Sequence, residues 1–282
     1  MIIARSINKV RSVIDRAKRA HSMIGFVPTM GALHQGHLSL VKEASRECDF
    51  VVVSIFVNPL QFGPKEDYKK YPRNFKNDEK LLRRNGVNLI FYPNPKLMYG
   101  KDFSTFVEEE DLSKVLCGSS RPGHFKGVCT IVAKLFNIVH ADIAYFGQKD
   151  YQQALIIRRL IEDLDFPIKI KILPIVREPS GLAMSSRNNY LSPGQIKDAG
   201  VLYEALKLSK KLIRQGQRDP KKIIREIKFL IKSRKAVKID YIEIKDANDL
   251  RDLKKIRGKV LIALAVYLGK TRLIDNIVMS VK

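Results

Sequence analysis

The sequence contains no apolar run long enough to form a membrane-spanning helix. Hydrophobic residues make up 45% of its 282 residues, but no apolar stretch approaches the ~20 residues that cross a bilayer. Residues 1–5 lead straight into an amphipathic pattern, which is typical of a folded element and not of a signal peptide. We therefore expect no membrane partner.

Cysteine is also scarce. Cys48, Cys117 and Cys129 lie far apart and form no Cys-x-x-Cys pair, which argues against a disulfide framework and against a zinc ribbon. Three isolated cysteines suit the reducing cytosol, so we predict a cytoplasmic protein.

Acidic residues are outnumbered by basic ones. The 52 lysines and arginines exceed the 29 aspartates and glutamates and leave a net charge of +23. Such a field attracts anionic ligands, and it keeps a basic nucleic-acid-binding module open as an alternative. The basic residues are scattered over helix surfaces, however, and no aromatic RNA-binding signature accompanies them. We therefore expect a lysine-rich solvated surface and no nucleic-acid partner.

Two common nucleotide-binding motifs are missing. There is no Walker A sequence, and no Gly-x-Gly-x-x-Gly follows the first predicted strand, which excludes a P-loop kinase and a dinucleotide oxidoreductase. Up to Val176, short apolar runs alternate with amphipathic helical patterns. This predicts an α/β fold with a doubly wound, mostly parallel, Rossmann-like sheet. The composition then changes, so we expect one domain of residues 1–176 and a smaller C-terminal α+β domain of residues 177–282.

The stretch 27–40 is the predicted centre of the active site. It has the pattern of a strand end, a turn with Gly31 and Gly36, and a helix start. A helix start presents unpaired N–H groups and a positive dipole end, so such a turn can hold a phosphate. His34 and His37 lie one helical turn apart there, where imidazoles can stabilise charge as a phosphorus–oxygen bond breaks. The alternative is that both histidines only cap and pack the turn.

Polar side chains also follow two later predicted strands. Asn58 and Gln61 come after an apolar, β-branched run, and Lys149 and Asp150 come after another. The carboxyl ends of parallel strands meet at one edge of a sheet, where open α/β sheets bind ligands. These side chains are therefore candidate substrate contacts, although Asn58 and Gln61 could equally serve only to hydrogen-bond their own loop.

Two glycine-bearing loops add basic side chains. Residues 116–127 form a second candidate anion-binding turn that carries Arg121. In residues 184–187, two serines and an arginine could form a flexible phosphate clamp, although alone this would more often be a surface loop. Taken together, the loops indicate an enzyme that handles a nucleoside triphosphate.

Five stretches together resemble the pantothenate synthetases, the pantoate–β-alanine ligase family. They are residues 28–37, 56–62, 121–128, 146–153 and 184–188. Their order and spacing are those of the family, and the resemblance extends over essentially the whole chain. The 34–37 turn and the 184–187 loop also resemble the two adenylate-forming signatures of class I aminoacyl-tRNA synthetases. Another adenylating ligase of that HIGH-type nucleotidyltransferase superfamily is therefore the alternative.

The resemblance implies an ATP-dependent condensation of (R)-pantoate with β-alanine. The pantoate carboxylate would attack the α-phosphorus of ATP to give pantoyl adenylate and pyrophosphate, and the amine of β-alanine would then displace AMP and form pantothenate. ATP with Mg²⁺ is the implied co-substrate, without a tightly bound organic cofactor. Members of the family are commonly dimers, so we expect a homodimer.

The resemblance also implies roles for individual residues. Catalysis would rest on His37 as proton donor, with His34 and Lys149. The implied ATP-binding residues are Pro28, Met30, Gly31, Ala32, Leu33, His34, Gly36, His37, Gly147, Gln148, Lys149, Asp150, Val176, Met184, Ser185, Ser186 and Arg187. The implied pantoate- and β-alanine-binding residues are Met30, Asn58, Gln61, Arg121 and Gln153. Asp78 would contact the Mg²⁺ that accompanies ATP.

Overall fold

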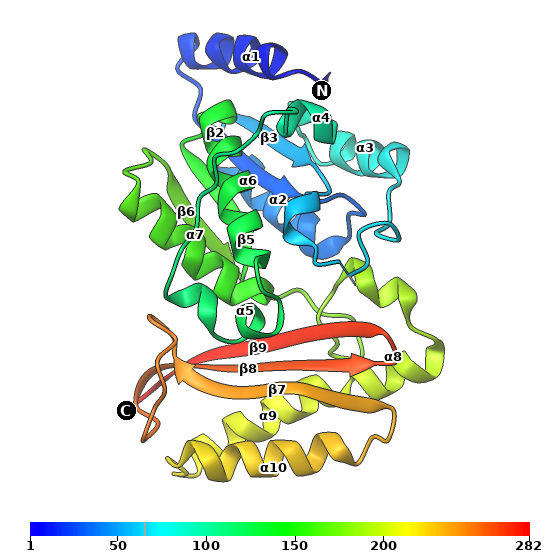
Figure 1. Cartoon of the computed structure of the whole chain (residues 1–282), viewed down its shortest axis with the longest axis vertical. Coiled ribbons are helices and arrows are strands. Elements are labelled where there is room, and N and C mark those ends of the chain that lie inside the picture. The colour runs from blue at the N-terminus through cyan, green and yellow to red at the C-terminus, as the bar shows by residue number, and fades with distance from the viewer. Residues whose placement is uncertain (65) are drawn as a thin grey trace. The chain divides into compact units, whose positions relative to one another are not determined.

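The computed structural model describes residues 1–64 and 66–282, and the chain separates into two compact units (Figure 1). The first unit comprises Met1–Gln148 and Gln152–Pro174, and the second comprises Lys149–Tyr151 and Ile175–Lys282. The sequence-based boundary after residue 176 assigns Lys149–Tyr151 to the first domain, whereas their contacts group them with the second unit.

The first unit is built on a six-stranded sheet in the order β1-β4-β3-β2-β5-β6, in which every pair is parallel. The strands are β1 (Ile2–Ala4), β2 (Ile24–Thr29), β3 (Phe50–Ile55), β4 (Leu89–Phe91), β5 (Ile143–Gly147) and β6 (Lys169–Leu173). Central strands such as β3 are apolar on both faces, as a parallel sheet covered by helices requires. The predicted doubly wound parallel sheet is confirmed.

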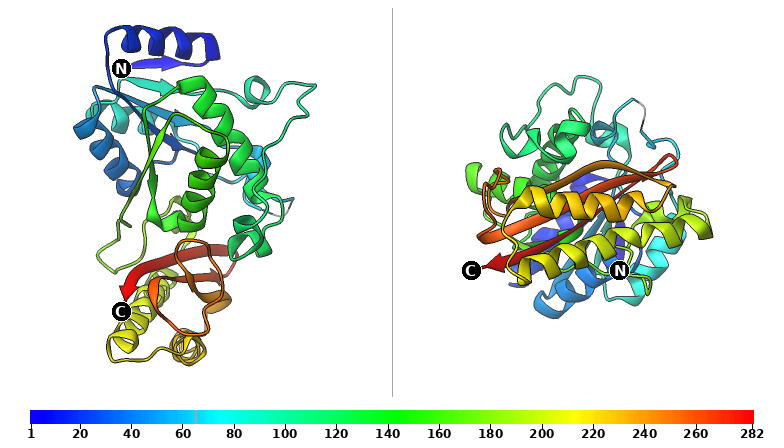
Figure 2. Two further views of the ribbon diagram at one scale, coloured as in Figure 1. Left: turned by 90° about the vertical axis from the view of Figure 1, so that its left-hand side faces the viewer. Right: turned by 90° about the horizontal axis from the view of Figure 1, so that it is seen from below.

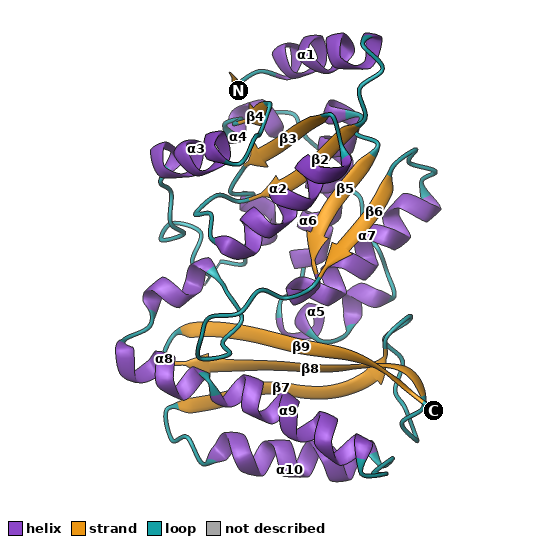
Figure 3. Cartoon of the chain, turned by 180° about the vertical axis from the view of Figure 1, so that it is seen from behind, coloured by secondary structure: helices purple, strands orange, loops and turns teal. Residues whose placement is uncertain are grey.

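Helices cover both faces of this sheet (Figure 3). They are α1 (Ile7–Arg19), α2 (Gln35–Glu47), α3 (Phe75–Arg84), α4 (Pro95–Met98), α5 (Cys117–Ser120), α6 (His124–Val139) and α7 (Tyr151–Asp163), with the 3-10 helices η1 (Pro59–Gln61), η2 (Leu112–Lys114) and η3 (Gln148–Asp150). On one face, Val41 of α2 and Leu82 of α3 pack with Val53 and Ile90 of the strands in a single core. Helices α6 and α7 lie on the other face.

Strand β1 is an element that the sequence did not indicate. Its three residues pair in parallel with Leu89–Phe91 of β4, which lies far along the chain. A pattern of three residues is too short to identify a strand, and only pairing with a distant partner stabilises it.

The strand order reverses beside β2, which lies between β3 and β5. The chain moves from β2 through β3 to β4 in one direction, and it later adds β5 and β6 on the other side. The carboxyl end of β2 is therefore the topological switch point, where doubly wound sheets open a ligand-binding crevice. Helix α2 begins there, and it brings His34 and His37 to this position.

The second unit is an antiparallel sheet of β7 (Val237–Asp246), β8 (Gly258–Leu268) and β9 (Thr271–Val281). Helices α9 (Val201–Arg214) and α10 (Pro220–Lys232) lie side by side across one face of this sheet (Figure 2). Ile223 and Ile227 of α10 share a buried core with alternate β8 residues, including Ile262 and Leu264. This unit has the predicted α+β character.

One predicted helix of the second unit is two helices. The pattern from Ser192 to about Gly216 predicts a single helix, but the structure has α8 (Pro193–Ala199) and α9, which meet at Gly200. The N–H of Gly200 donates to the Lys197 carbonyl, three residues back, at 3.3 Å. The hydrogen bond at Gly200 therefore spans three residues instead of four, which tightens the turn between the two helices.

Candidate active site

The chain reverses directly after β2 through two residues with left-handed backbone. Gly31 has φ 82° and Ala32 has φ 50°, a conformation that glycine adopts freely and alanine rarely. The Thr29 hydroxyl accepts a hydrogen bond from Gly31 N at 3.2 Å and donates one to the Ser54 carbonyl at 2.8 Å. Thr29 thereby ties the turn to the neighbouring strand β3.

Asp78 of α3 holds the same turn. Its side chain is almost fully buried, and its two carboxylate oxygens accept hydrogen bonds from Ala32 N at 2.9 Å and Leu33 N at 2.8 Å. Burial raises the pKa of Asp78, and the two backbone hydrogen bonds oppose that rise. Because both oxygens are engaged by backbone, Asp78 fits a clamp on the turn better than the Mg²⁺ contact expected of it.

His34 and His37 close the N-terminus of α2 as a reciprocal pair. Nδ1 of His34, the N-cap residue, accepts a hydrogen bond from Gly36 N at 3.1 Å, and Nδ1 of His37 accepts one from His34 N at 3.4 Å. The two ring centroids are 4.1 Å apart. A neutral imidazole that accepts at Nδ1 carries its proton at Nε2. Both histidines therefore cap the start of α2, as the alternative interpretation expected. In the neutral form that accepts at Nδ1, each ring carries an N–H group at Nε2.

The backbone N–H groups of this turn are used within the protein. Gly31 N donates to Thr29, Ala32 N and Leu33 N donate to Asp78, and His34 N donates to His37. The backbone N–H groups of residues 31–34 therefore hold the turn in shape.

Asn58 and Gln61 lie at the exit of β3. Asn58 is 1% exposed. Its amide nitrogen donates to the Gly127 carbonyl at 3.0 Å and to Gln61 Oε1 at 3.2 Å. Its Oδ1 accepts a hydrogen bond from the Tyr99 hydroxyl at 2.7 Å. Both amide hydrogens of Asn58 thus have protein partners. Gln61 Nε2 lies 3.0 Å from the sulfur of Met30. Asn58 therefore supports η1, and Gln61 is the half-buried side chain that η1 presents beside Met30.

Arg121 is paired within the protein. Its guanidinium meets the Glu66 carboxylate at 2.6 Å and 2.7 Å, and it also donates to the Gln61 carbonyl at 3.2 Å. His124 Nδ1 lies 2.8 Å from the same carbonyl. Burial of Glu66 opposes its ionisation, but the hydrogen bonds and charge of Arg121 outweigh this and lower the pKa of Glu66. Arg121 therefore anchors the loop that carries Gln61.

Replacing Glu66 with glutamine should destabilise the protein by about 1 kcal/mol near pH 7 and by much less near pH 3. The contribution of a carboxylate whose folded pKa is lowered is complete above its usual pKa and is lost as the pH falls through the lowered pKa. Urea unfolding of wild type and variant at both pH values measures this. Glu79→Gln, which removes a more exposed pair with Arg83, is the control. An equal loss for Glu66→Gln at both pH values would contradict the prediction.

Two adjacent glutamines at the start of α7 have different roles. Gln152 is buried; its amide nitrogen lies 2.7 Å from both the Leu112 and Val115 carbonyls, and its oxygen accepts from Cys117 N at 3.0 Å. Gln153, which the sequence singled out, is half-buried. Because Gln152 is used in packing the segment 112–117, only Gln153 has the exposure that a substrate contact needs.

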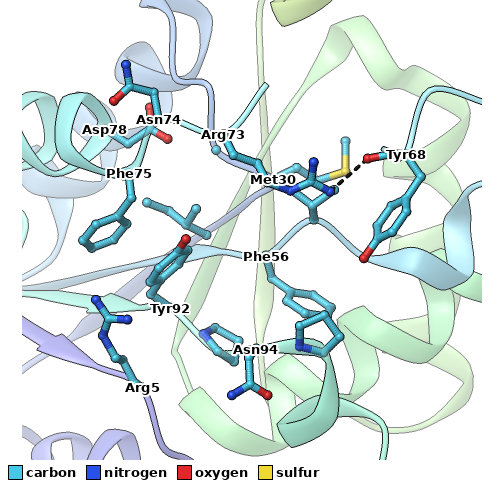
Figure 4. A pocket seen from close by; sticks show the side chains of 15 residues that line it. Arg5, Met30, Phe56, Tyr68, Arg73, Asn74, Phe75, Asp78, Tyr92 and Asn94 are labelled. Carbon is cyan, nitrogen blue, oxygen red and sulfur yellow. Dashed lines mark hydrogen bonds between the residues drawn. The ribbon is translucent and has the colours of Figure 1, made fainter. Parts of the chain in front are cut away.

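A cavity of about 300 Å³ opens at the carboxyl ends of β2, β3 and β4 (Figure 4). Three predicted site residues line it, namely Met30, Gly31 and Asp78. Gln61, Gln153 and the two histidines are not part of its lining. The cavity therefore adjoins the predicted site without containing all of it.

Much of the remaining lining was not indicated by the sequence. The rings of Phe75 and Tyr92 stack 4.2 Å apart, and the guanidinium of Arg5 lies 5.3 Å from the Tyr92 centroid. Arg73 donates to the Tyr68 carbonyl at 2.9 Å (Figure 4). Tyr92 directly follows β4, so its place at a strand exit is the one signal that could have pointed to it.

In the second unit, both neighbours of Asp150 are held, Lys149 through its backbone and Tyr151 through its side chain. The Lys149 carbonyl accepts a hydrogen bond from Asn276 Nδ2 at 2.9 Å, and the Tyr151 hydroxyl donates to the Ala247 carbonyl at 2.8 Å. Lys149 Nζ lies 3.6 Å from Asp150 Oδ2. These contacts are the reason why Lys149–Tyr151 group with the second unit.

The loop predicted to be flexible is tied by hydrogen bonds. Met184 N donates to the Val176 carbonyl at 3.0 Å. Ser185 then caps η4 (Ser186–Tyr190), since its hydroxyl accepts from Arg187 N at 3.3 Å. Ser186 is buried. The loop thus has a defined shape, in which two serines and an arginine are presented at the start of a 3-10 turn.

The predicted site residues fall into two groups. Those in the first unit are Pro28, Met30, Gly31, Ala32, Leu33, His34, Gly36, His37, Asn58, Gln61, Asp78, Arg121, Gly147, Gln148 and Gln153, and those in the second are Lys149, Asp150, Val176, Met184, Ser185, Ser186 and Arg187. Among residues 1–64 and 66–282, no group of three or more histidine, cysteine, aspartate or glutamate side chains is placed to hold a metal ion. In the same part of the chain, no helix is long and apolar enough to span a membrane.

The chain is thus a doubly wound α/β protein with paired histidines at a helix start, at the switch point where such sheets bind their ligands. The family model described as pantoate-beta-alanine ligase matches residues 2–278. The chain therefore belongs to the pantoate–β-alanine ligase family, which confirms the resemblance seen in its sequence motifs.

Relatives match the chain over its whole length. It is 54% identical over 281 residues to a pantothenate synthetase of Thermotoga petrophila, with 99% of this chain and 100% of the relative covered. It is 50% identical over 281 residues to that of Caldicellulosiruptor saccharolyticus, with both chains fully covered. The crystal structure of the Thermus thermophilus pantothenate synthetase superposes with a TM-score of 0.94 at 43% identity, covering 98% of this chain and 99% of that one.

A further solved relative carries ligands. The pantoate-beta-alanine ligase of Francisella tularensis, in complex with β-γ ATP and β-alanine, matches with a TM-score of 0.81 at 38% identity. The match covers 98% of this chain and 97% of that one.

Proposed function

We propose that this chain condenses pantoate with β-alanine, using ATP and passing through pantoyl adenylate, to give pantothenate, AMP and pyrophosphate. The observation that carries this proposal is the match at about 50% identity, over full length, to pantothenate synthetases. The Francisella ligase, which binds β-γ ATP and β-alanine, supports the assignment of these substrates. The paired histidines at the switch point supply the chemistry that adenylation requires.

In the first step, a carboxylate oxygen of pantoate forms a bond to the α-phosphorus of ATP as the bond to the β-phosphate oxygen breaks. Negative charge develops on the α-phosphate oxygens. The Nε2–H groups of His34 and His37 would donate hydrogen bonds to that charge. Because Nδ1 of each ring is engaged at the helix start, both imidazoles are held with the proton on Nε2.

In the second step, the amine of β-alanine attacks the acyl carbon of pantoyl adenylate and AMP leaves. The new bond is an amide, and the proton lost by the amine goes to solvent or to a base. Adenylation is needed because a free carboxylate is a poor acyl donor, whereas the adenylate carries a phosphate leaving group.

The β- and γ-phosphates would be bound by residues of the second unit. Lys149 and Arg187 supply positive charge, and Ser185 and Ser186 supply hydroxyl donors. Asp150 and the backbone at Gly147 and Val176 would border the nucleoside. This assignment makes pyrophosphate the product that these cations stabilise as it leaves.

Pantoate would be bound in the first unit by Gln61, Gln153 and Met30. A side-chain amide can both donate to and accept from the hydroxyl and carboxylate groups of a hydroxy acid. Asn58 and Arg121 would act through Gln61, since their own polar groups hold η1 and its loop in place.

Mg²⁺ would accompany the ATP phosphates, with no organic cofactor required. Both oxygens of Asp78 accept backbone hydrogen bonds, and no step is assigned to this residue. We further propose a homodimer in the cytoplasm, on the basis of the family and of the three cysteines, none of which forms a disulfide.

The protein should exchange labelled pyrophosphate into ATP only when pantoate is present, and it should release AMP when β-alanine is added. Lys149→Ala should lower the exchange rate by about 10- to 100-fold, since a charged hydrogen bond to phosphate is lost. Lys210→Ala, which removes an equal charge from an exposed helix position, is the control. Exchange without pantoate, or exchange driven by an amino acid, would reject the proposed function.

A further inference from the structure

Strand β9 carries a buried carboxylate that no sequence motif indicated. Asp275 is 2% exposed, and its two oxygens meet the guanidinium of Arg177 at 2.6 Å and 2.9 Å. Arg177 also donates to the Gly181 carbonyl at 2.9 Å and lies 4.1 Å from the ring centroid of Tyr203. A carboxylate this deeply buried requires such a partner. Arg177 and Ala183 form an antiparallel bridge, so the ion pair fixes the base of the hairpin of residues 177–183 that leads into the 184–187 loop.

The next residue of β9 contacts the other predicted phosphate-binding element. Asn276 is 3% exposed; its Nδ2 donates to the Lys149 carbonyl at 2.9 Å, and its own N–H donates to Asp275 Oδ1 at 2.8 Å. One dipeptide of one strand therefore holds both the backbone of Lys149 and the hairpin through Arg177. All of these residues belong to the second unit.

We infer that Asp275 and Asn276 are positioning residues for the adenylation step. They hold the Lys149 backbone and the 184–187 loop in a fixed arrangement, so that their cations and hydroxyls meet the triphosphate together. The inference rests on the proposed function, in which Lys149, Ser185, Ser186 and Arg187 bind the β- and γ-phosphates.

The physical reason lies in the reach of the Lys149 side chain. A lysine has a flexible four-carbon stem, so the place of its ammonium group depends on where its backbone is held. Asn276 fixes that backbone at the carbonyl, within hydrogen-bond distance. Small misplacements of groups that contact a reacting phosphate lower the rate strongly. Loss of the hydrogen bond from Asn276 to the Lys149 carbonyl should therefore lower the rate of adenylation.

A role in stability alone predicts a different result, and the same strand offers a matched control. Arg272 of β9 pairs with Asp240 of β7 at 2.8 Å, with side chains 15% and 18% exposed. This pair is also a guanidinium–carboxylate pair on β9, and the Asp240 carboxylate accepts hydrogen bonds from Arg272 at 3.0 Å and 2.8 Å. Asp240→Asn therefore reports what the loss of a half-buried ion pair in this sheet does by itself.

The test measures the two half-reactions separately in the full-length enzyme. Pantoate-dependent pyrophosphate exchange reports adenylation, and release of AMP from supplied pantoyl adenylate by β-alanine reports the second step. Asn276→Ala should raise the KM for ATP or lower the exchange rate by about 5- to 10-fold, the effect of about one hydrogen bond. Asp275→Asn should lower exchange by a similar factor or more. Both variants should keep the rate of the second half-reaction within about 2-fold of wild type. Asp240→Asn should keep the rates of both half-reactions within about 2-fold of wild type.

A further variant separates positioning from packing. Asn276→Asp keeps the size of the side chain but places a carboxylate oxygen against the Lys149 carbonyl, so exchange should fall further than in Asn276→Ala. The inference would be overturned if both Asn276 variants exchanged pyrophosphate with the wild-type rate and KM. It would also be overturned if a variant lost as much activity in the second half-reaction as in exchange, or if Asp240→Asn lost as much exchange as the Asp275 and Asn276 variants. A wild-type enzyme without pantoate-dependent exchange would instead reject the proposed function.

Discussion

Replacing His37 with alanine should lower pantoate-dependent pyrophosphate exchange by about 100- to 1,000-fold, the usual effect of removing one donor from a developing oxyanion. The fold should survive, because His37 is only half-buried and the hydrogen bond that its Nδ1 accepts from His34 N is long, at 3.4 Å. Loss of that capping contact should cost about 0.5–1 kcal/mol. Pyrophosphate exchange assays measure the loss of activity, and thermal melting measures the loss of stability.

A second substitution at this position separates capping from catalysis. His37 occupies the third position of the helix, where glutamine is an ordinary partner in a capping box. His37→Gln should therefore keep the melting temperature of wild type and still lose most of the exchange activity. His21→Asn, at an exposed residue whose φ of 55° asparagine tolerates, should change neither. If His37→Gln retained full exchange, the histidine would be a cap and nothing more.

Replacing Gly127 with alanine should unfold the protein more easily, by about 1–3 kcal/mol, and should weaken pantoate binding at least about 10-fold. Gly127 lies in the first turns of α6, against η1. A Cβ placed there would overlap the Leu60 carbonyl and lie 2.7 Å from Gln61 N, closer than the 3.0 Å below which real Cβ contacts are essentially absent. Both atoms are backbone, so relieving the clash requires η1 and α6 to move apart, which changes the position of Gln61 relative to α6.

The predicted loss of stability in Gly127→Ala is opposite in sign to the gain that helix propensity alone would give, so the two explanations can be told apart. Alanine in a helix is intrinsically better than glycine by about 1 kcal/mol, so without the clash Gly127→Ala should stabilise α6. Gly194→Ala in α8 is the matched control, because nothing lies within 4 Å of its added Cβ. Urea unfolding and the KM for pantoate in the exchange assay provide the readouts. An unchanged KM with raised stability would show that η1 moves without consequence, and the role given to Gln61 would be wrong.

Local patterns determined much of the fold. The alternation of apolar strands and amphipathic helices predicted the parallel sheet, and the capping box at Ser192 and Asp219-Pro220 marked two helix starts correctly. Their physical basis is short-range, since caps and helix faces involve residues three or four apart. The single helix expected across Gly200 was wrong for the same reason, because whether a glycine interrupts a helix depends on surroundings that the pattern does not contain.

The sequence by itself also determined which functional groups are candidates for catalysis. His34 and His37 are spaced to meet at one helix start, and the five motif stretches identified the ligase family. What it could not decide was which polar groups the protein itself uses. Asp78 binds the backbone of Ala32, 46 residues away, and Arg121 pairs with Glu66, 55 residues away.

Only the tertiary structure decided these partners, because they come from elements that lie together after folding and not along the chain. Asn276 contacts Lys149 across 127 residues, and no spacing rule connects two such positions. A side chain is available to a substrate only if the fold leaves its polar groups without a better internal partner, since buried polar groups must be satisfied. The motifs therefore named the candidates, and the fold divided them into side chains that face a substrate and side chains that hold those in place.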